Sequence, residues 1–508
     1  MRLSLRSESD QVGSFVSYNP KTGKELRRFE DASQKDVVES VSQAGEAGKV
    51  WGRKTFPERA EQLRKLGSLM GRGANALVSI VTLEIGKPLQ ESYGADLLPC
   101  LKGIRWLESN AQALLSSRNI QSNIEMQAVP YGVVGVIGTW NYPLYLNFAP
   151  IIWAVAAGNA VVWKPSELAT VTAVALQALF EEAKLPIKMI VGGAETGKFL
   201  CNSDFDKLAF TGGIKTGRAI LGELAKSGTP SVMELSGNDV MIVCEDADIK
   251  VVAKSAVWGR VSNCGQSCVA PQRILVDAKI YPAFLEECEK ILKALQPGRD
   301  FTLMRTPELA RNAQRLVDES VELGAKIVYK CDTQEPWKQA VSPTLLADCD
   351  LAMAVFREDF FGPVLATKSF DEIEEAENYV NLHSEMGLGA SIWTKNFQNG
   401  SEIAARLNVG LVSINEILLD AADPKIPFGG FRGSGFGKLR GAEGLNEFVR
   451  WRTVVVHSAG GERRHLFPYN EQTLPILKGL VELEASSGIR EKVGAITKLA
   501  DAARKWKK

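Results

Sequence analysis

The spacing of apolar residues changes several times along the chain and divides it into regions. Between residues 34 and 109, apolar positions recur every three or four residues, which predicts helices that form a layer over a sheet. Residues 118–129 alternate weakly between polar and apolar positions. That stretch predicts an extended arm, and it is a candidate strand for pairing with another subunit.

Short apolar runs, separated by polar loops and helical segments, dominate the middle of the chain. Runs of this kind lie at 133–137, 159–163, 188–191 and 207–210, and a second series lies at 240–243, 273–276, 389–393 and 412–415. Repeated strand–loop–helix units predict parallel sheets with helices on their faces. In such sheets ligands bind at the carboxyl ends of the strands, where these polar loops lie. The expected fold class is therefore α/β.

The end of the chain has a different pattern, with two further helical segments after residue 461. The apolar residues of the second segment share one helix face, and its other positions are rich in lysine and arginine: Ile489, Val493, Ile496, Leu499, Ala503 and Trp506 make up the apolar face. One interpretation is that this face packs on the protein itself or on a dimer mate. The other is peripheral contact of residues 489–508 with an anionic membrane surface.

Composition excludes several classes of protein. The chain has 508 residues, of which 45% are hydrophobic and 24% charged, as in ordinary globular proteins. Lysine plus arginine and aspartate plus glutamate both number 60, so no excess of positive charge points to nucleic acid. At this length two or three domains are expected.

Cysteine usage predicts a reducing, cytoplasmic compartment. The eight cysteines form no C-x-x-C pair, and the three histidines do not cluster with them, so neither a disulfide framework nor a metal site is expected. The amino-terminal stretch has no long apolar core, and we expect no signal peptide.

Two polar turns carry the candidate chemistry. Glu234 stands in the turn E-L-S-G, and Cys268 follows 34 residues later in G-Q-S-C-V-A, each beside a glycine. A cysteine nucleophile with a carboxylate that activates water is typical of acyl-enzyme chemistry. The alternative, a Cys-His hydrolase, requires the fold to bring His383, His457 or His465 to Cys268, because none is near it in sequence.

Further motifs show a resemblance to the NAD(P)-dependent aldehyde dehydrogenase family. They are W-N-Y-P (140–143), K-P-S-E (164–167), F-T-G-G-x-x-x-G (210–217), E-L-S-G (234–237), G-Q-S-C-V-A (265–270), F-F-G-P-V (360–364) and P-F-G-G (427–430). They stand in the family's order and with its spacing between the glutamate and the cysteine. The amino-acid sequence around Asn141 and Cys268 is most similar to that of the family branch that oxidises fatty and aromatic aldehydes.

The resemblance implies a reaction and its catalytic residues. Cys268 adds to the aldehyde to give a thiohemiacetal, which becomes a thioester after oxidation. Asn141 and the backbone N–H of Cys268 stabilise the oxyanion. Glu234 activates the water that releases the carboxylic acid. No metal is implied.

The resemblance also implies the cofactor contacts. Lys164 and Glu167 are expected at the adenosine ribose, where a carboxylate favours NAD and repels the 2′-phosphate of NADP, which remains the alternative. The other cofactor candidates are Trp140, Thr211, Gly212, Gly213, Gly217, Asp359 and Phe361. The family often has a hydroxyl residue where Gly213 stands and a glutamate where Asp359 stands.

Substrate residues are inferred from the same motifs. The candidates are Tyr142, Tyr145, Ser262, Val269 and Phe428, whose apolar character indicates an oily aldehyde. No arginine stands among them to pair with a substrate carboxylate. Some branches use a lysine and a glutamate as a proton relay, but here Pro150 and Leu439 stand at those positions. Proton exit is therefore expected to follow another route.

The implied architecture has two parallel-sheet α/β domains and a small β oligomerisation arm. The expected ranges are 1–110 with 131–236 for cofactor binding, 237–446 for catalysis, 111–130 with 447–460 for the arm, and 461–508 for a helical extension. The arm predicts a homodimer or homotetramer. Two other functions stay open: CoA-dependent acyl transfer, against which Glu234 counts, and a non-catalytic cofactor-binding protein.

Overall fold

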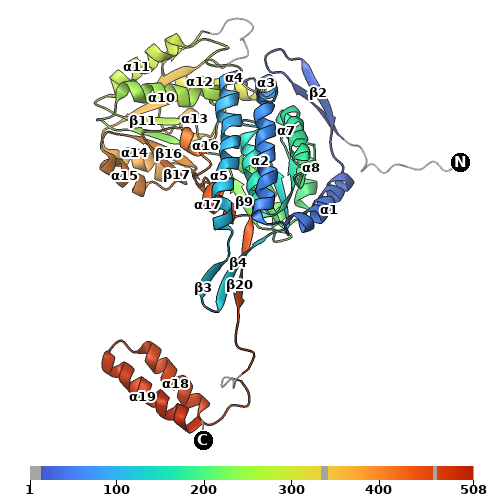
Figure 1. Ribbon diagram of the computed structural model, residues 1–508. Helices are drawn as coiled ribbons and strands as arrows, with labels where there is room; N and C mark the ends of the chain where they lie inside the picture. The colour runs from blue at the N-terminus through green and yellow to red at the C-terminus, as the bar shows by residue number, and fades with distance from the viewer. Residues whose placement is uncertain (1–12, 333–340, 461–465, 507–508) are drawn as a thin grey trace, which may run out of the picture. The chain divides into compact units, whose positions relative to one another are not determined.

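The computed structural model describes residues 13–332, 341–460 and 466–506 (Figure 1). The amino-terminal stretch considered for a signal peptide, and His465, lie outside the described residues. The chain forms two units, Met1–Ser117 with Gln127–Arg452 and Arg118–Met126 with Thr453–Lys508. Both predicted α/β domains belong to the first unit.

Five parallel strands and one short antiparallel strand form the first sheet (Figure 1). Its order is β19-β9-β8-β5-β6-β7, with bounds β5 (Val133–Ile137), β6 (Ala160–Lys164), β7 (Ile187–Met189), β8 (Lys207–Thr211), β9 (Ser231–Glu234) and β19 (Gly435–Phe436). In the register, Thr211 pairs with Glu234, and Ile137 pairs with Lys164. The parallel strands thus end side by side, and the loops after them meet at one edge of the sheet.

Helices cover both faces of this sheet because its strands are apolar on both sides. On β5, Val134 and Val136 join the core beneath α2 (Phe56–Arg72), α3 (Ala74–Ile85), α5 (Leu98–Leu114), α6 (Tyr145–Ala157) and α7 (Thr170–Glu182). Val133 and Ile137 join the opposite core, beneath α1 (Gln34–Trp51), α8 (Ala194–Cys201) and α9 (Ile214–Leu224).

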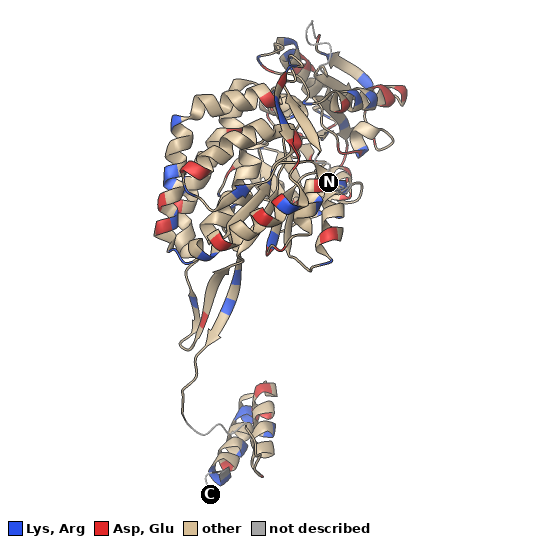
Figure 2. Ribbon diagram, turned by 90° about the vertical axis from the view of Figure 1, so that its right-hand side faces the viewer, with Lys and Arg blue, Asp and Glu red and all other residues tan. Residues whose placement is uncertain are grey.

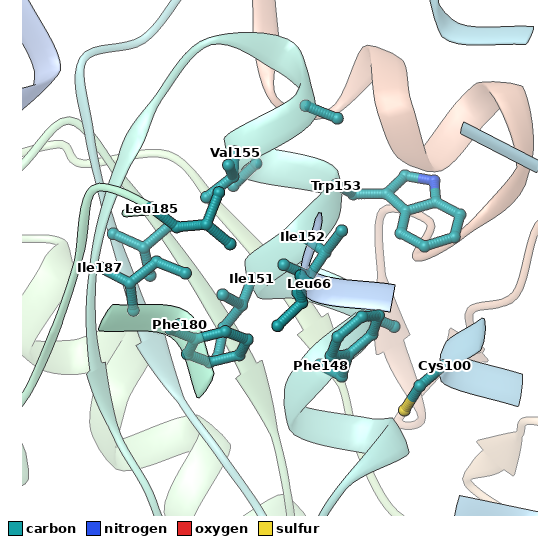
Figure 3. Close-up of a cluster of buried hydrophobic side chains, with 14 of the residues drawn as sticks. Leu66, Cys100, Phe148, Ile151, Ile152, Trp153, Val155, Phe180, Leu185 and Ile187 are labelled. Carbon is teal, nitrogen blue, oxygen red and sulfur yellow. The ribbon is translucent and has the colours of Figure 1, made fainter. Parts of the chain in front are cut away.

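Helix α6 lies at the centre of the larger core. Its residues are apolar on every side, as expected for a helix with no solvent-facing surface. Figure 3 shows Phe148, Ile151 and Trp153 from this helix, with Phe180 and Ile187 nearby. The helix ends at Gly158, whose φ of 105° is a left-handed conformation that glycine adopts without strain.

The second sheet has six parallel strands and an antiparallel edge strand, β12. Its order is β12-β13-β14-β11-β10-β16-β17, with bounds β10 (Val240–Val243), β11 (Arg273–Asp277), β12 (Lys326–Lys330), β13 (Thr344–Ala347), β14 (Val364–Phe370), β16 (Gly389–Trp393) and β17 (Leu411–Ile414). One face packs against α10 (Ile249–Val261) and α11 (Tyr281–Ala294). The other packs against α12 (Pro307–Glu322), α13 (Ala354–Arg357), α14 (Ile373–Asn381) and α15 (Phe397–Arg406).

The predicted α/β class with parallel sheets is confirmed, but several elements differ from expectation. The last part of the helical region expected up to residue 109 consists of three pieces: α4 (Leu89–Glu91), a π-helix η2 (Ser92–Leu97) and α5. Strand β2 (Glu25–Glu30), which pairs with β1 (Ser14–Tyr18), was not predicted, because its sequence E-L-R-R-F-E is mostly polar. Helix α12 was also missed, although Thr306 and Pro307 are a typical helix start.

Short elements complete the first unit. They are η3 (Glu167–Ala169), η4 (Ser262–Gly265), β15 (Met386–Gly387), α16 (Leu419–Ala422), β18 (Phe431–Arg432) and α17 (Gly441–Asn446). Within the described ranges, no single helix is long and apolar enough to cross a membrane, and only α2 with α3, a pair bent by 71°, passes by length and composition. Most of the apolar residues of α2 and α3 are buried in the larger core.

A three-stranded sheet and a helical hairpin complete the chain. The sheet has the order β20-β4-β3, with bounds β3 (Arg118–Gln121), β4 (Ile124–Pro130) and β20 (Val449–Val455). Its exposed apolar residues include Ile120 and Val455. The use of this arm in a homodimer or homotetramer stays a prediction. The hairpin consists of α18 (Thr473–Ala485) and α19 (Ile489–Trp506), the two helical segments expected from the sequence.

Candidate active site

One cleft, with a volume of about 720 Å³, opens where the strands of the first sheet end. The loops after β5, β6, β8 and β9 line it together with α8 and α9, and the second α/β region supplies Cys268, Asp359 and Phe361. It brings together most of the predicted site residues: Trp140, Asn141, Lys164, Glu167, Thr211, Gly212, Gly213, Glu234, Cys268, Asp359 and Phe361. Residues separated by more than two hundred positions in sequence therefore share one cavity.

Glu234 is the last residue of β9 and is almost completely buried. Its Oε1 atom has no hydrogen-bond partner among the described residues. Burial raises the pKa of Glu234 to about 7, although the Cys268 thiol, the Arg440 charge and the Thr211 hydroxyl oppose the rise. A carboxyl group with this pKa exchanges protons near neutral pH, as a general base must.

Cys268 lines the cleft and interacts with Glu234 through its thiol. Burial raises the pKa of Cys268 well above its ordinary value, and the negative charges of Glu234 and Asp239 raise it further. The cysteine is therefore a thiol at rest, and a nearby base must take its proton before it attacks a carbonyl. Cys264, which the sequence analysis did not include in the site, is buried and donates to the Thr302 carbonyl oxygen.

Two hydrogen bonds hold the Asn141 side chain and leave one of its amide N–H groups without a partner in these bonds. Its Nδ2 donates to the Gln266 carbonyl oxygen at 3.1 Å, and its Oδ1 accepts from the Thr139 hydroxyl at 3.1 Å. An amide nitrogen has two hydrogens, so one N–H remains for an oxyanion in the cleft. This is the arrangement expected for the oxyanion donor.

A buried ion pair fixes the backbone of Asn141, and the sequence analysis did not identify it. Lys87 Nζ donates to Asp96 Oδ2 at 2.8 Å and to the carbonyl oxygen of Asn141 at 2.8 Å. The side chains of Lys87 and Asp96 are both fully buried. Asp96 Oδ1 also accepts from the backbone N–H of Leu144. The pair therefore connects the helical layer to the loop that carries the oxyanion donor.

The loop before Cys268 has unusual backbone geometry. Asn263, Cys264 and Gly265 have φ angles of 50°, 53° and 68°, in the left-handed region that non-glycine residues rarely adopt. Glu91 accepts a hydrogen bond from the backbone N–H of Asn263 at 2.8 Å, and burial raises the pKa of this carboxyl to about 7. Strained backbone of this kind persists only where surrounding contacts fix it.

The π-helix η2 explains how Glu91 and Asp96 both reach this region. A π-helix makes hydrogen bonds between residues five apart, whereas residues at that spacing diverge on an α-helix. Glu91 immediately precedes η2, and Asp96, five residues later, lies within it. In the sequence, the one sign of this arrangement was the presence of charged residues in a helical segment that was expected to cover a sheet.

The adenosine side of the cleft is formed by the loop after β6. Lys164 Nζ donates to the carbonyl oxygens of Pro165 and Gly192 at 3.0 and 2.7 Å and lies 4.0 Å from Glu167 Oε2. Burial lowers the pKa of Lys164. The Glu167 side chain is 48% exposed, so its carboxylate remains accessible to ribose hydroxyls.

The phosphate side of the cleft is the start of α9. The first N–H groups of a helix lack intrahelical partners and point toward an anion. Gly213 immediately precedes this helix, and an added Cβ there would meet no atom within 4 Å. At Gly212, a Cβ would lie 2.5 Å from the Phe210 ring, and at Gly217 it would lie 2.4 Å from Leu235. Gly217 does not line the cleft and instead allows α9 to pack closely on Leu235.

The nicotinamide side combines a carboxylate with aromatic rings. Asp359 Oδ1 accepts from Gln272 Nε2 at 2.9 Å, and burial raises the pKa of Asp359. Phe361 and Trp140 meet edge to face, with ring centroids 5.7 Å apart. Taken with the open start of α9 and the exposed Glu167, these residues fit a nicotinamide dinucleotide.

The five predicted substrate residues do not line this cleft. Tyr142 lies under the Lys87 ammonium group, 4.0 Å from its ring centroid, and Val269 lines a second, much smaller cavity beside Pro271. Tyr145, Ser262 and Phe428 are buried. Their assignment to the aldehyde side of Cys268 stays a prediction.

An arginine that was not among the substrate candidates lies beside two of them. The Arg440 guanidinium lies 4.4 Å from the Phe428 ring centroid and 5.3 Å from that of Tyr145. It donates to the Tyr145 hydroxyl and to the Ala421 carbonyl oxygen, and its Nε has no partner among the described residues. Leu439 and Pro150, the positions of the missing proton relay, hold no titratable group. Sequence spacing alone could not place Arg440 beside Tyr145.

Comparisons with known proteins agree with this geometry. The model of the aldehyde dehydrogenase family matches residues 7–454. The chain is 31% identical to a 4,4'-diapolycopene aldehyde oxidase of Methylomonas, over 92% of this chain and 91% of that protein. It is 30% identical to an NADP+ succinate-semialdehyde dehydrogenase of Deinococcus radiodurans, over 87% and 94%.

A solved structure, Mycobacterium tuberculosis aldehyde dehydrogenase complexed with NAD+, superposes with a TM-score of 0.83 at 27% identity, covering 88% of this chain and 96% of that one. This chain therefore belongs to the aldehyde dehydrogenase family and is an aldehyde-oxidising enzyme.

The buried ion pair gives a first prediction. Lys87→Met removes the donor to Asn141 and leaves Asp96 charged and unpaired, so we expect loss of stability together with a fall in kcat of roughly ten- to a hundredfold. The double variant Lys87→Met/Asp96→Asn removes the unpaired charge and should recover thermal stability but not kcat. Thermal unfolding and steady-state kinetics measure the two effects. A double variant with full kcat would show that the pair supports the fold alone.

The glycines before α9 give a second prediction. Gly213→Ser fits the open space, caps α9 and adds a hydroxyl at the anion site, so it should tighten NAD+ binding by roughly threefold or more. Gly212→Ser is the matched control, because its side chain would collide with the Phe210 ring and weaken binding. Calorimetric titration with NAD+ measures both. Equal losses in the two variants would contradict this description of the helix start.

Proposed function

We propose that this enzyme oxidises an apolar aldehyde to its carboxylic acid through a thioester on Cys268, with NAD+ as the oxidant. The observation that carries the proposal is the convergence of Cys268, Glu234 and Asn141 in one cleft. Each has the environment its step requires: a protonated thiol beside a base, a carboxyl group with a pKa of about 7, and an amide with a free N–H.

The residues of the chain divide the reaction between them. Glu234 takes the proton of the Cys268 thiol, and the thiolate adds to the aldehyde carbonyl. Asn141 donates to the oxygen of the resulting thiohemiacetal. NAD+, when bound, accepts the hydride that leaves the substrate carbon. Glu234 passes its first proton to solvent. It then takes a proton from the water that attacks the thioester and returns this proton to the departing Cys268 sulfur, so that the acid and the thiol are released.

NAD+ is the preferred cofactor in this proposal. Glu167 stands where the ribose hydroxyls are expected, and its negative charge opposes the 2′-phosphate of NADP+. The Mycobacterium structure is a complex with NAD+, whereas the Deinococcus relative is named for NADP+. NADP+ is therefore the alternative that a direct comparison of the two cofactors must test.

Two other proposals concern the release step and the compartment. Hydrolysis is preferred to transfer onto CoA, because Glu234 is present and directed at Cys268. A reducing, cytoplasmic compartment is proposed because all eight cysteines are free thiols.

An acidic aldehyde is a second candidate substrate, and Arg440 is the observation that favours it. Its partly unpaired guanidinium lies against Tyr145 and Phe428, where an arginine could pair with a substrate carboxylate. We prefer an apolar aldehyde because Arg440 already donates to two oxygens of the chain and lies over two aromatic rings.

The catalytic assignment gives a third prediction. Cys268→Ala should form no NADH with any aldehyde, whereas Glu234→Gln should release about one equivalent of NADH per site and then turn over roughly a hundredfold more slowly. In the native enzyme, the base form of Glu234 increases as pH rises, so thioester hydrolysis should rise through about pH 7 and then level off. Stopped-flow absorbance separates the burst from turnover. Steady turnover without a burst in Glu234→Gln would remove this residue from deacylation.

The substrate class gives a fourth prediction. Decanal and benzaldehyde should give a higher kcat/KM than succinic semialdehyde by at least roughly tenfold, because the candidate substrate residues are mostly apolar. Arg440→Met is the discriminating variant: it should change little for decanal. A selective loss of succinic semialdehyde oxidation in this variant, with that substrate preferred by the native enzyme, would establish the acidic class instead. Parallel assays with CoA distinguish acyl-CoA from free acid.

A further inference from the structure

The carboxyl-terminal hairpin carries an apolar face that its own packing does not use. Helices α18 and α19 are antiparallel, since Gly479 packs on Leu499 and Glu482 pairs with Lys498 at 2.7 Å. The contact between them is made largely by small residues, with Gly479, Ala495 and Ala502 buried. Small residues let the two helices approach closely, so the hairpin does not require large apolar side chains elsewhere.

Six large aliphatic side chains nevertheless point away from the contact between the helices. All are at least 52% exposed: Leu474, Leu477 and Val481 on α18, and Ile489, Val493 and Ile496 on α19. Within each helix they are spaced three, four or seven residues apart, so they form one stripe per helix. We call these six residues the outer apolar face.

The two stripes point in different directions. At about 100° per residue, the stripe of α18 lies on the side roughly opposite its contact with α19. The stripe of α19 is turned by roughly 110° from the side that contacts α18. The α19 stripe is about 11 Å long from Ile489 to Ile496, and it leaves that helix free to lie along a surface.

Unpaired cations border this face. Lys478 and Arg490 are exposed, as are Lys492 and Arg504, and no ion pair joins any of the four to another described residue. The lysines that do form ion pairs, Lys498 and Lys505, lie toward the back of α19. Figure 2 shows Lys and Arg in blue along these helices. Long basic side chains can keep their charges in water while their stems cover apolar surface.

We propose that the outer apolar face docks this enzyme onto an anionic lipid surface. Aliphatic residues on one side of a helix, with cations at the edges, are the pattern of helices that lie in the plane of a membrane interface. The exposed aromatic residues Phe467 and Tyr469, just before α18, are of the type favoured at that depth. A second copy of the same face is less suitable, because its bordering cations would repel their equivalents. One carboxylate, that of the exposed Glu484, lies beside the stripe of α18, so the border of the face is not wholly positive.

Flotation of the full-length enzyme with vesicles tests the proposal. Vesicles of phosphatidylcholine with phosphatidylserine should carry the enzyme, and vesicles of phosphatidylcholine alone should carry at least roughly tenfold less, with binding reduced by salt. Val493→Gln/Ile496→Gln should reduce binding more than about tenfold. Gln keeps helix propensity at these exposed positions, and circular dichroism verifies the helices.

Two charge variants with equal loss of positive charge locate the binding face. Lys492→Gln/Arg504→Gln should weaken binding to anionic vesicles by about 30-fold, at about 1 kcal/mol per cation. Lys498→Gln/Lys505→Gln, on the back of α19, should change it by less than about threefold. NADH formation from a short aldehyde in solution should be equal in all variants, so a failure of docking is distinct from a failure of catalysis.

Three outcomes would overturn the proposal. One is absence of binding to anionic vesicles by the native enzyme. The second is equal weakening by the two charge variants, which indicates general electrostatic attraction rather than a docking face. The third is a change of oligomeric state in Val493→Gln/Ile496→Gln without vesicles, which shows that a second copy occupies the face.

Discussion

The active site depends on the parallel register of the first sheet. Thr211 at the end of β8 pairs with Glu234 at the end of β9, and Ile137 at the end of β5 pairs with Lys164 at the end of β6. A slip of one residue would turn Glu234 to the other face of the sheet. Gly435 of β19 pairs with Glu234 on its other side, at a φ of 104° and so close to Met233 that a Cβ would lie 2.0 Å from its carbonyl oxygen. Backbone pairing on both sides thus holds the proposed general base before any side chain contributes.

Burial then couples the charges of the site. Removing Glu234 and Cys268 from water raises both pKa values, and each negative charge disfavours the other. Only one of the two is readily ionised, which suits a cycle in which thiol, carboxyl and water exchange protons one at a time. Arg440 favours the ionised carboxylate, whereas the Lys87 and Asp96 pair neutralises itself and acts on Asn141 through the backbone. The site therefore separates groups that exchange protons from groups that fix geometry.

Sequence reasoning predicted what is local and missed what depends on distant contacts. Loops after apolar runs were recognised, so Asn141, Lys164, Thr211, Glu234 and Cys268 were found in the cleft where they were expected. Glu91 and Asp96 were missed because a helical pattern does not distinguish a solvated charge from a buried one, and Lys87 was missed because it lies in the short connection after α3. The π-helix that turns Asp96 toward Lys87 has no clear sequence signature. Arg440 was missed because its neighbours Tyr145 and Ala421 are remote in sequence, and Gly217, expected at the cofactor, instead serves helix packing.

The hairpin follows a different physical rule from the rest of the chain. In the first unit, large aliphatic side chains fill the cores, and exposed ones are scattered. In the hairpin, small residues and Leu499 form the contact between the helices, and six large aliphatic residues face outward. Large apolar residues exposed to water add no stability to an isolated helix pair, so their concentration in one stripe of each helix indicates a contact made outside the hairpin. Because the bordering side chains are positively charged, the contacted surface is expected to be negatively charged. An anionic surface that also dissolves oily aldehydes would raise their concentration near the enzyme. Docking itself depends on the hairpin alone, whichever aldehyde the cleft accepts.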